Sequence, residues 1–204
     1  MGFNNREEIF INLIHYPIYS LGLGTRIGIW FQGCTLRCKG CISPHTWEFE
    51  DRYKTTISKT IDQVKSYTKF CPHGITISGG EPFAQSDALY TLLIRIREVG
   101  FHDIMLYSGH SFEYLNNRYS HILKLIDVLV DSPFIQGLET DSFWKGSENQ
   151  NMFILTNNNK QQKRYSDYIN RKERKLQIVE TDEDIHIIGI PRQTDSEVIK
   201  NGFS

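Results

Sequence analysis

Three cysteines, Cys34, Cys38 and Cys41, have the residue type and spacing that most clearly indicate chemistry in this chain. They follow one another as C-x3-C-x2-C, and no fourth cysteine lies near them in the sequence. A cluster of four irons normally takes four protein ligands. Three thiolates would leave one iron open, and an open iron can bind a small molecule directly. The spacing therefore favours a catalytic iron–sulfur site.

Zinc is the alternative metal for these cysteines. A structural zinc ion takes four ligands in a closed tetrahedron, usually from two pairs of Cys or His residues. His45 could supply a fourth ligand, and so could Cys71 from farther along the chain. A disulfide is disfavoured, because nothing indicates export and three clustered thiols would leave one unpaired. The spacing alone leaves both the cluster and the zinc site open.

A second motif lies at residues 75–83, with the sequence ITISGGEPF. Its first residues are β-branched and predict a short buried strand, which a Gly-Gly turn ends. Gly79 and Gly80 would let the backbone come close to a ligand at the carboxyl end of that strand. Glu81 then offers a carboxylate, and Pro82 stiffens the exit. By itself Gly-Gly-Glu-Pro is a common turn, and it indicates a ligand site only in combination with the cysteine motif.

Together the two motifs resemble the radical S-adenosylmethionine (SAM) superfamily. Longer stretches are similar to the activating enzymes of anaerobic (class III) ribonucleotide reductase. These stretches are GIWFQGC at 28–34, CISPHTW at 41–47, LYSG at 106–109, DVLVDSPF at 127–134 and WKGSENQ at 144–150. The similarity runs from about Ile11 to Gln150, with a looser echo at 187–191.

The resemblance implies a role for each matching residue. Cys34, Cys38 and Cys41 would hold a [4Fe-4S] cluster, whose fourth iron would bind the amino and carboxylate groups of SAM. The residues that would contact SAM are Gly79, Gly80, Glu81, Ser108 and Asp131. Ser108 and Asp131 both follow expected strands, where they could equally act as a helix cap and a turn former.

Gly40 marks a departure from the wider superfamily. Many members carry an aromatic residue just before the third cysteine, where it packs near the adenine of SAM. This chain has Gly40 there, as do the activating enzymes that it resembles. The resemblance implies that Gly40 is a cofactor-binding position. The adenine would be held by other groups, such as the backbone near Ile42 or Ser108.

The resemblance implies a radical SAM oxidoreductase that activates a glycyl radical enzyme. A reduced cluster would pass one electron to SAM, which would give methionine and a 5′-deoxyadenosyl radical. That radical would remove a hydrogen atom from a glycine Cα of the partner, expected to be anaerobic ribonucleoside-triphosphate reductase. The electron donor would be a flavodoxin or a similar carrier.

Two other functions stay open on the sequence alone. One is a radical SAM enzyme that modifies a peptide or a small metabolite. The other is a zinc-stabilised binding module without catalysis. Metal analysis separates the binding module from the radical SAM enzymes, since the module would contain zinc without iron or sulfide.

The composition is that of a compact cytoplasmic enzyme. With 204 residues, of which 39% are hydrophobic and 23% charged, the chain can bury one core, and we expect one domain over residues 1–204. A net charge of −1 gives no electrostatic reason to expect nucleic acid or an anionic membrane as a partner. No apolar run reaches the length of a membrane helix. Four cysteines without a secretory pattern indicate a reducing compartment.

Strands and helices are expected to alternate. The expected strands are 9–18, 26–31, 75–77, 104–107 and 127–130, and the expected helices are 55–70, 84–99 and 112–125. This order predicts an α/β fold with a parallel sheet and helices outside it. The chain is shorter than the roughly 250 residues of a full eight-unit barrel. We therefore expect a partial (incomplete) TIM-like β/α barrel of the radical SAM type, with a side groove that could admit a segment of another protein.

The end of the chain differs in character. The segment at about 157–175 is polar, which predicts a solvated loop or an exposed helix, with a docking surface as the alternative. The stretch at about 175–191 predicts a β-hairpin that could close an edge of the sheet.

Overall fold

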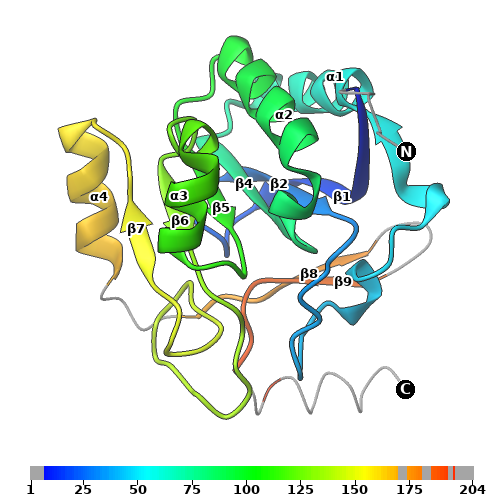
Figure 1. Cartoon of the computed structure of the whole chain (residues 1–204). Helices are drawn as coiled ribbons and strands as arrows, with labels where there is room; N and C mark the ends of the chain where they lie inside the picture. Colours follow the sequence, from blue (N-terminus) through cyan, green and yellow to red (C-terminus); the bar gives the residue numbers. More distant parts are fainter. Residues whose placement is uncertain (1–6, 170–173, 181–184, 193–194, 196–204) are drawn as a thin grey trace.

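A seven-stranded sheet forms the centre of the molecule (Figure 1). The computed structural model describes residues 7–169, 174–180, 185–192 and 195. The strands lie in the order β3-β1-β2-β4-β5-β6-β7. Their bounds are β1 Glu8–Ile18, β2 Arg26–Phe31, β3 Lys54–Thr56, β4 Gly74–Gly79, β5 Ile104–Tyr107, β6 Val128–Val130 and β7 Met152–Ile154.

Four central strands, β2, β4, β5 and β6, are parallel. The strands outside them run antiparallel: β1 and β3 at one side, β7 at the other. The sheet is open, because β3 and β7 are its two end strands. The expected α/β class and incomplete barrel are therefore confirmed. The short strands β3 and β7 have no counterpart among the expected elements.

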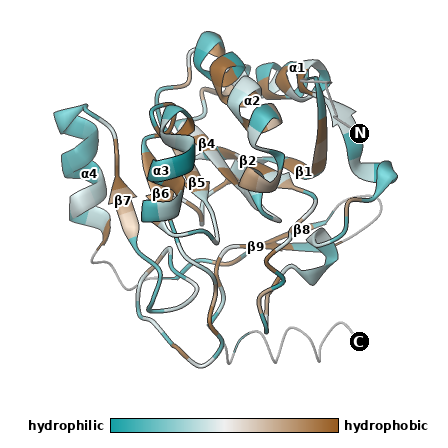
Figure 2. Cartoon of the chain, in the orientation of Figure 1, coloured by the Kyte–Doolittle hydropathy of each residue, from teal (hydrophilic) through white to brown (hydrophobic). Residues whose placement is uncertain are grey.

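Three helices cover one face of this sheet (Figure 1). The helices of the described chain are α1 Ile57–Tyr67, α2 Ser86–Val99, α3 Phe112–Leu123 and α4 Asn159–Ile169. The first three pack on the apolar residues that alternate along the parallel strands, such as Ile29, Ile77 and Leu106, which are fully buried. Figure 2 shows that the strands of the sheet are largely hydrophobic, whereas α4 is largely hydrophilic. None of the described helices has the length and apolar character needed to cross a bilayer.

The helix ends follow local signals that refine the expected bounds. The first helix begins at Ile57 instead of residue 55, because Lys54–Thr56 pairs with β1. The hydroxyl of Thr56 then caps the helix by accepting a hydrogen bond from the backbone N–H of Lys59. Gly100, with a φ of 104°, ends α2 as expected.

A two-stranded hairpin, β8 (Gln177–Glu180) and β9 (Ile185–Ile188), packs on the opposite face of the sheet from α1, α2 and α3. Val179 and Ile188 bury their side chains against Ile18 and Leu21. Ser20 donates a hydrogen bond to the carbonyl of Ile188 at 3.2 Å. The hairpin lies where the sequence predicts one, although residues 170–173 and 181–184 fall outside the described chain. A single domain over 1–204 stays a prediction for the same reason.

A fully buried arginine holds the amino-terminal end of the sheet together. Arg26 pairs with the carboxylate of Asp103 at 3.0 Å. Its guanidinium also donates to the Thr76 hydroxyl at 2.7 Å and to the Ile75 carbonyl at 2.6 Å. The hydroxyl of Tyr165 on α4 donates to the same Asp103 oxygen at 2.6 Å. This network joins β2, β4, the start of β5 and α4.

We expect Asp103→Ala to lower the free energy of unfolding by about 3–5 kcal/mol, because it leaves the buried Arg26 charge without a counter-charge. Urea unfolding monitored by circular dichroism measures the change. Lys163→Ala is the control: it removes an exposed ion pair with Asp167 and should change the free energy by less than about 0.5 kcal/mol. A loss below about 1 kcal/mol for Asp103→Ala would contradict a central role for the network.

Candidate cluster and cofactor site

A cavity of about 220 Å³ lies at the carboxyl ends of β2, β4 and β5. Nearly all the residues that the sequence singles out line it. These are Cys34, Cys38, Gly40, Cys41, Gly79, Gly80, Glu81 and Ser108. Segments that are far apart in the sequence therefore meet at one place.

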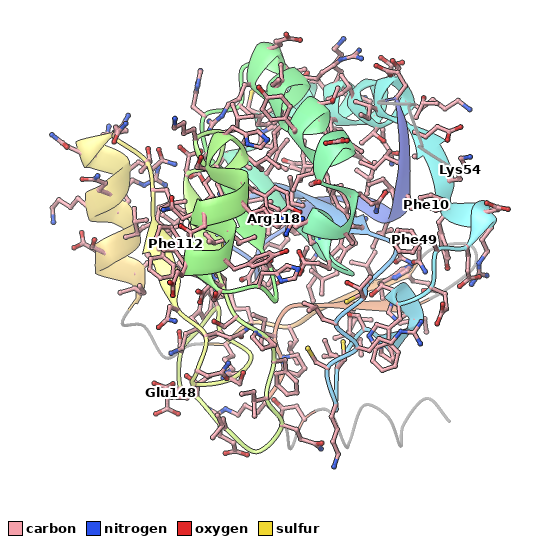
Figure 3. All side chains as sticks on the ribbon, in the orientation of Figure 1. Phe10, Phe49, Lys54, Phe112, Arg118 and Glu148 are labelled. Carbon is pink, nitrogen blue, oxygen red and sulfur yellow. The ribbon has the colours of Figure 1, made fainter. Side chains whose placement is uncertain are left out.

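The loop that carries the cysteines is fastened at its start by backbone hydrogen bonds. The N–H of Gly33 donates to the carbonyl of Thr46 at 2.8 Å, and the N–H of Cys34 donates to Trp47 at 2.8 Å. Gly33 has a φ of 101°, and a Cβ atom there would collide with the ring of Phe49. Phe49 in turn packs edge-on against Phe10 of β1, as Figure 3 shows. The two ends of the loop are therefore joined to each other, and Phe49 packs the second end against β1.

The three thiols lie close enough to influence one another. Burial raises the pKa of the Cys38 thiol, and charge on Cys41 and Cys34 raises it further. The backbone N–H of Phe134 opposes this rise by hydrogen bonding to the sulfur. A metal centre binds the thiolate form of cysteine, and its positive charge offsets the cost of burying the negative sulfur.

Three cysteines line the cavity, and a four-iron cluster with one open iron takes three cysteine ligands, each on a separate iron. A closed zinc site needs a fourth ligand. Cys71 is exposed and lines a different cavity with His102 and Asp103, so it is not placed to join them.

The Gly-Gly turn after β4 locks the cysteine loop against the sheet. The N–H of Gly80 donates to the Phe31 carbonyl at 2.8 Å, and the N–H of Glu81 donates to the Gly33 carbonyl at 2.9 Å. A Cβ atom at Gly79 would collide with the backbone of Phe31, and one at Gly80 would collide with the Gly33 carbonyl. Glycine is therefore required at both positions by backbone contact, in addition to any contact with a ligand.

Glu81 is buried in the cavity wall, with 1% of its surface exposed. Its carboxylate accepts hydrogen bonds from the N–H of Gly109 at 2.8 Å and from the Ser108 hydroxyl at 3.0 Å. The N–H of Phe83 is a third donor, at 3.0 Å. Burial raises the pKa of Glu81 to about 7, against the lowering effect of these hydrogen bonds. Glu81 thus joins the carboxyl ends of β4 and β5.

Ser108 and Asp131 have clear structural partners. Ser108 bonds Glu81, while Ser111 takes the capping position of α3. Asp131 is buried and is not among the described residues that line the cavity. Its carboxylate accepts hydrogen bonds from the N–H groups of Phe112 and Asn151. A contact between Asp131 and SAM stays a prediction, and its observed contacts hold the loops beside the cavity.

Two polar groups in the cavity wall have no hydrogen-bond partner within the described chain. They are the hydroxyl of Tyr107 and the indole N–H of Trp47, both buried. Burial of unpaired polar atoms is unfavourable, so such atoms commonly indicate a ligand. Three thiols and these donors suit a cluster with a polar cofactor. Tyr107 was not singled out from the sequence, although its place directly before Ser108 at a strand end could have indicated it.

An open α/β sheet with three thiols and a Gly-Gly-Glu turn in one cavity defines a radical SAM protein with a four-iron cluster. The chain belongs to the 4Fe-4S single cluster domain family, whose profile matches residues 20–153. The helix α4 and the hairpin β8–β9 lie beyond the matched residues.

Named relatives make the similarity more particular. The anaerobic ribonucleoside-triphosphate reductase-activating protein of Vibrio cholerae serotype O1 is 36% identical over 148 residues, 67% of this chain and 92% of that protein. The protein of the same name from Escherichia coli is 33% identical over 144 residues, 67% of this chain and 93% of that one. The pyruvate formate-lyase-activating enzyme of Clostridium pasteurianum is 31% identical over 122 residues, 56% and 50% of the two chains.

The buried carboxyl of Glu81 predicts a pH dependence of stability. Its folded pKa of about 7 lies above the ordinary value of 4.5, so the folded protein binds the extra proton between these values. Stability should therefore fall as pH rises from about 5 to about 8, by up to about 3 kcal/mol relative to Glu81→Gln. Chemical unfolding of both proteins across this range measures the difference. Parallel pH profiles of the two proteins would contradict the prediction.

Proposed function

We propose that this chain uses a [4Fe-4S] cluster and SAM to generate a glycyl radical on anaerobic ribonucleoside-triphosphate reductase. The observation that carries the proposal is the single cavity in which three cysteines meet the Gly-Gly-Glu turn of β4. The similarity to activating proteins along nearly their whole length supports the same function.

Cys34, Cys38 and Cys41 would hold the cluster, since all three line the cavity and lie within electrostatic reach of one another. When bound, the cluster and SAM supply a one-electron cleavage of a carbon–sulfur bond and the radical that removes hydrogen from glycine. The chain itself binds and orients these groups. It also limits their contact with water, because Trp30 and Trp47 stand in the cavity wall.

The proposed contacts to SAM come from the strand ends. Gly79 and Gly80 place the backbone at the cavity wall, and Gly40 lines the cavity beside the third cysteine. Glu81 and Ser108 form one hydrogen-bonded unit, and its carboxylate is the proposed partner for the amino group of SAM. Asp131 would act at a distance by holding the amino end of α3.

The electron donor and the compartment belong to the same proposal. A flavodoxin-like protein would reduce the cluster, and the cytoplasm would provide the reducing conditions that free thiols and an oxygen-sensitive cluster require. Neither a nucleic acid nor a membrane is part of the proposal, since the net charge of −1 attracts neither.

Low-temperature EPR on the anaerobically reconstituted and reduced protein tests the proposal. A [4Fe-4S]+ signal that changes when SAM is added is the expected result, because an open iron would bind the cofactor. Addition of the reductase should then produce a glycyl radical signal. Bound zinc, or a cluster whose signal ignores SAM, would overturn the proposal.

Replacement of any one cluster cysteine should abolish SAM cleavage. For Cys34→Ala, Cys38→Ala and Cys41→Ala we expect 5′-deoxyadenosine formation to fall to background, because two thiolates cannot hold the cluster in its site. Chromatography of the reduced reaction measures this product. Cys71→Ala is the matched control and should keep full activity, since Cys71 lies outside the cavity. Normal cleavage in a cluster-cysteine variant would exclude the mechanism.

A further inference from the structure

The hairpin β8–β9 presents three isoleucines and one glutamate on the face that points away from the sheet. Its register pairs Ile178 with Ile187 and Glu180 with Ile185, so these four residues share one face. The other face carries Val179 and Ile188, which are buried against the sheet. Ile178 is 69% exposed and Ile185 is 53% exposed. A cluster of exposed isoleucines on a two-stranded hairpin is typical of an interaction site.

The cysteine loop extends this face. Ile42, which directly follows Cys41, is 47% exposed. Together with Ile185 and Ile187 it lines a groove of about 360 Å³. We call Ile42, Ile178, Ile185 and Ile187 the isoleucine platform. In Figure 1 the hairpin lies beside the loop that follows β2, which is where the two parts of the platform meet.

The groove adjoins the cofactor cavity. Trp30, Ile42, Ser43 and Ile187 line both, so the two hollows share a wall. The described residues that line the groove include no Lys, Arg, Asp or Glu, and their only ionisable side chains are His45 and His186. An uncharged, apolar segment therefore suits the groove, whereas a charged segment would lose hydration without gaining a partner.

The hairpin is firmly held in this position. Gln177 donates to the carbonyl of Pro17 at 2.8 Å, and Ser20 donates to that of Ile188. Arg174, just before β8, donates to the carbonyls of Ile190 and Pro191 at 3.1 Å. The platform is thus formed before any partner arrives, which lowers the entropy lost on binding.

We propose that the isoleucine platform and its groove bind the extended, uncharged segment of the glycyl radical enzyme that carries the acceptor glycine. The inference rests on the proposed function, which requires a glycine Cα to enter the cofactor cavity. An extended segment that crosses the platform would enter the cavity through the groove. The hairpin strands β8 and β9 lie beyond the residues that the family profile matches.

The test uses Ile178→Glu and Ile185→Glu in the full-length, reconstituted protein. Both side chains are exposed, and neither is among the described residues of the cofactor cavity. With the reductase present below saturation, we expect glycyl radical formation, measured by EPR, to fall at least about ten-fold in each variant. The KM for the reductase should rise. SAM cleavage without the reductase should stay within about two-fold of wild type, because the cofactor cavity is unchanged.

Phe70→Glu is the matched control. Phe70 is 55% exposed, as much as Ile185, but it lies before β4 at the opposite end of the parallel strands. This variant adds the same charge at a comparably exposed apolar site. We expect both SAM cleavage and radical formation to match wild type.

The outcomes separate the platform from the proposed function. If the wild-type protein cleaves no SAM, the proposed function fails. If wild type forms the glycyl radical and both platform variants match it, the platform inference is overturned while the function stands. Two other results also overturn it. Loss of reductase-independent SAM cleavage would assign the face to cofactor binding, and a wild-type dimer that dissociates in the variants would assign it to a second copy of this chain.

Discussion

The contact between the cysteine loop and the turn after β4 is the constraint on which the site depends. Two backbone hydrogen bonds, from Gly80 and Glu81, tie these segments together. The approach leaves no room for a Cβ atom at Gly79 or Gly80. Because the cysteines follow directly on one side and Glu81 on the other, this single junction sets the distance between the cysteine thiols and the carboxylate. The pairing of β2 with β4 in turn fixes the junction.

Glu81 connects the end of β4 to the end of β5 through hydrogen bonds. A carboxylate with 1% exposure would be destabilising without partners, and three donors from two segments supply them. The same contacts fix Ser108 and Gly109 at the edge of the cavity. Asp131 repeats the arrangement one strand farther on, where it holds Phe112 and Asn151. These polar residues at the strand ends therefore connect neighbouring loops at the carboxyl edge of the sheet.

Much of this could be predicted from the sequence, and the exceptions have physical reasons. The cysteine spacing and the Gly-Gly-Glu turn are local patterns, and β4 and β5 are apolar runs with clear ends. The strands β3 and β7 have three residues each and are stabilised by pairing with β1 and β6. Strands this short show no periodic pattern of apolar residues that could predict them. The partners of Ser108 and Asp131 lie in distant segments, which single-residue reasoning does not bring together. Tyr107 precedes Ser108 at a strand end, but its buried hydroxyl without a partner becomes evident only in the structure.

The hydrogen bond from Tyr165 to Asp103 joins α4 to the buried network at the amino-terminal end of the sheet. Asp103 and Arg26 lie within the family-matched residues, whereas Tyr165 lies beyond them. A lineage that lost α4 would expose one oxygen of this carboxylate, and it would need water or another donor there. Positions 26, 103 and 165 are therefore expected to change together over evolution. Exchange of the carboxyl-terminal segment between relatives would therefore have to preserve a hydrogen-bond donor to Asp103.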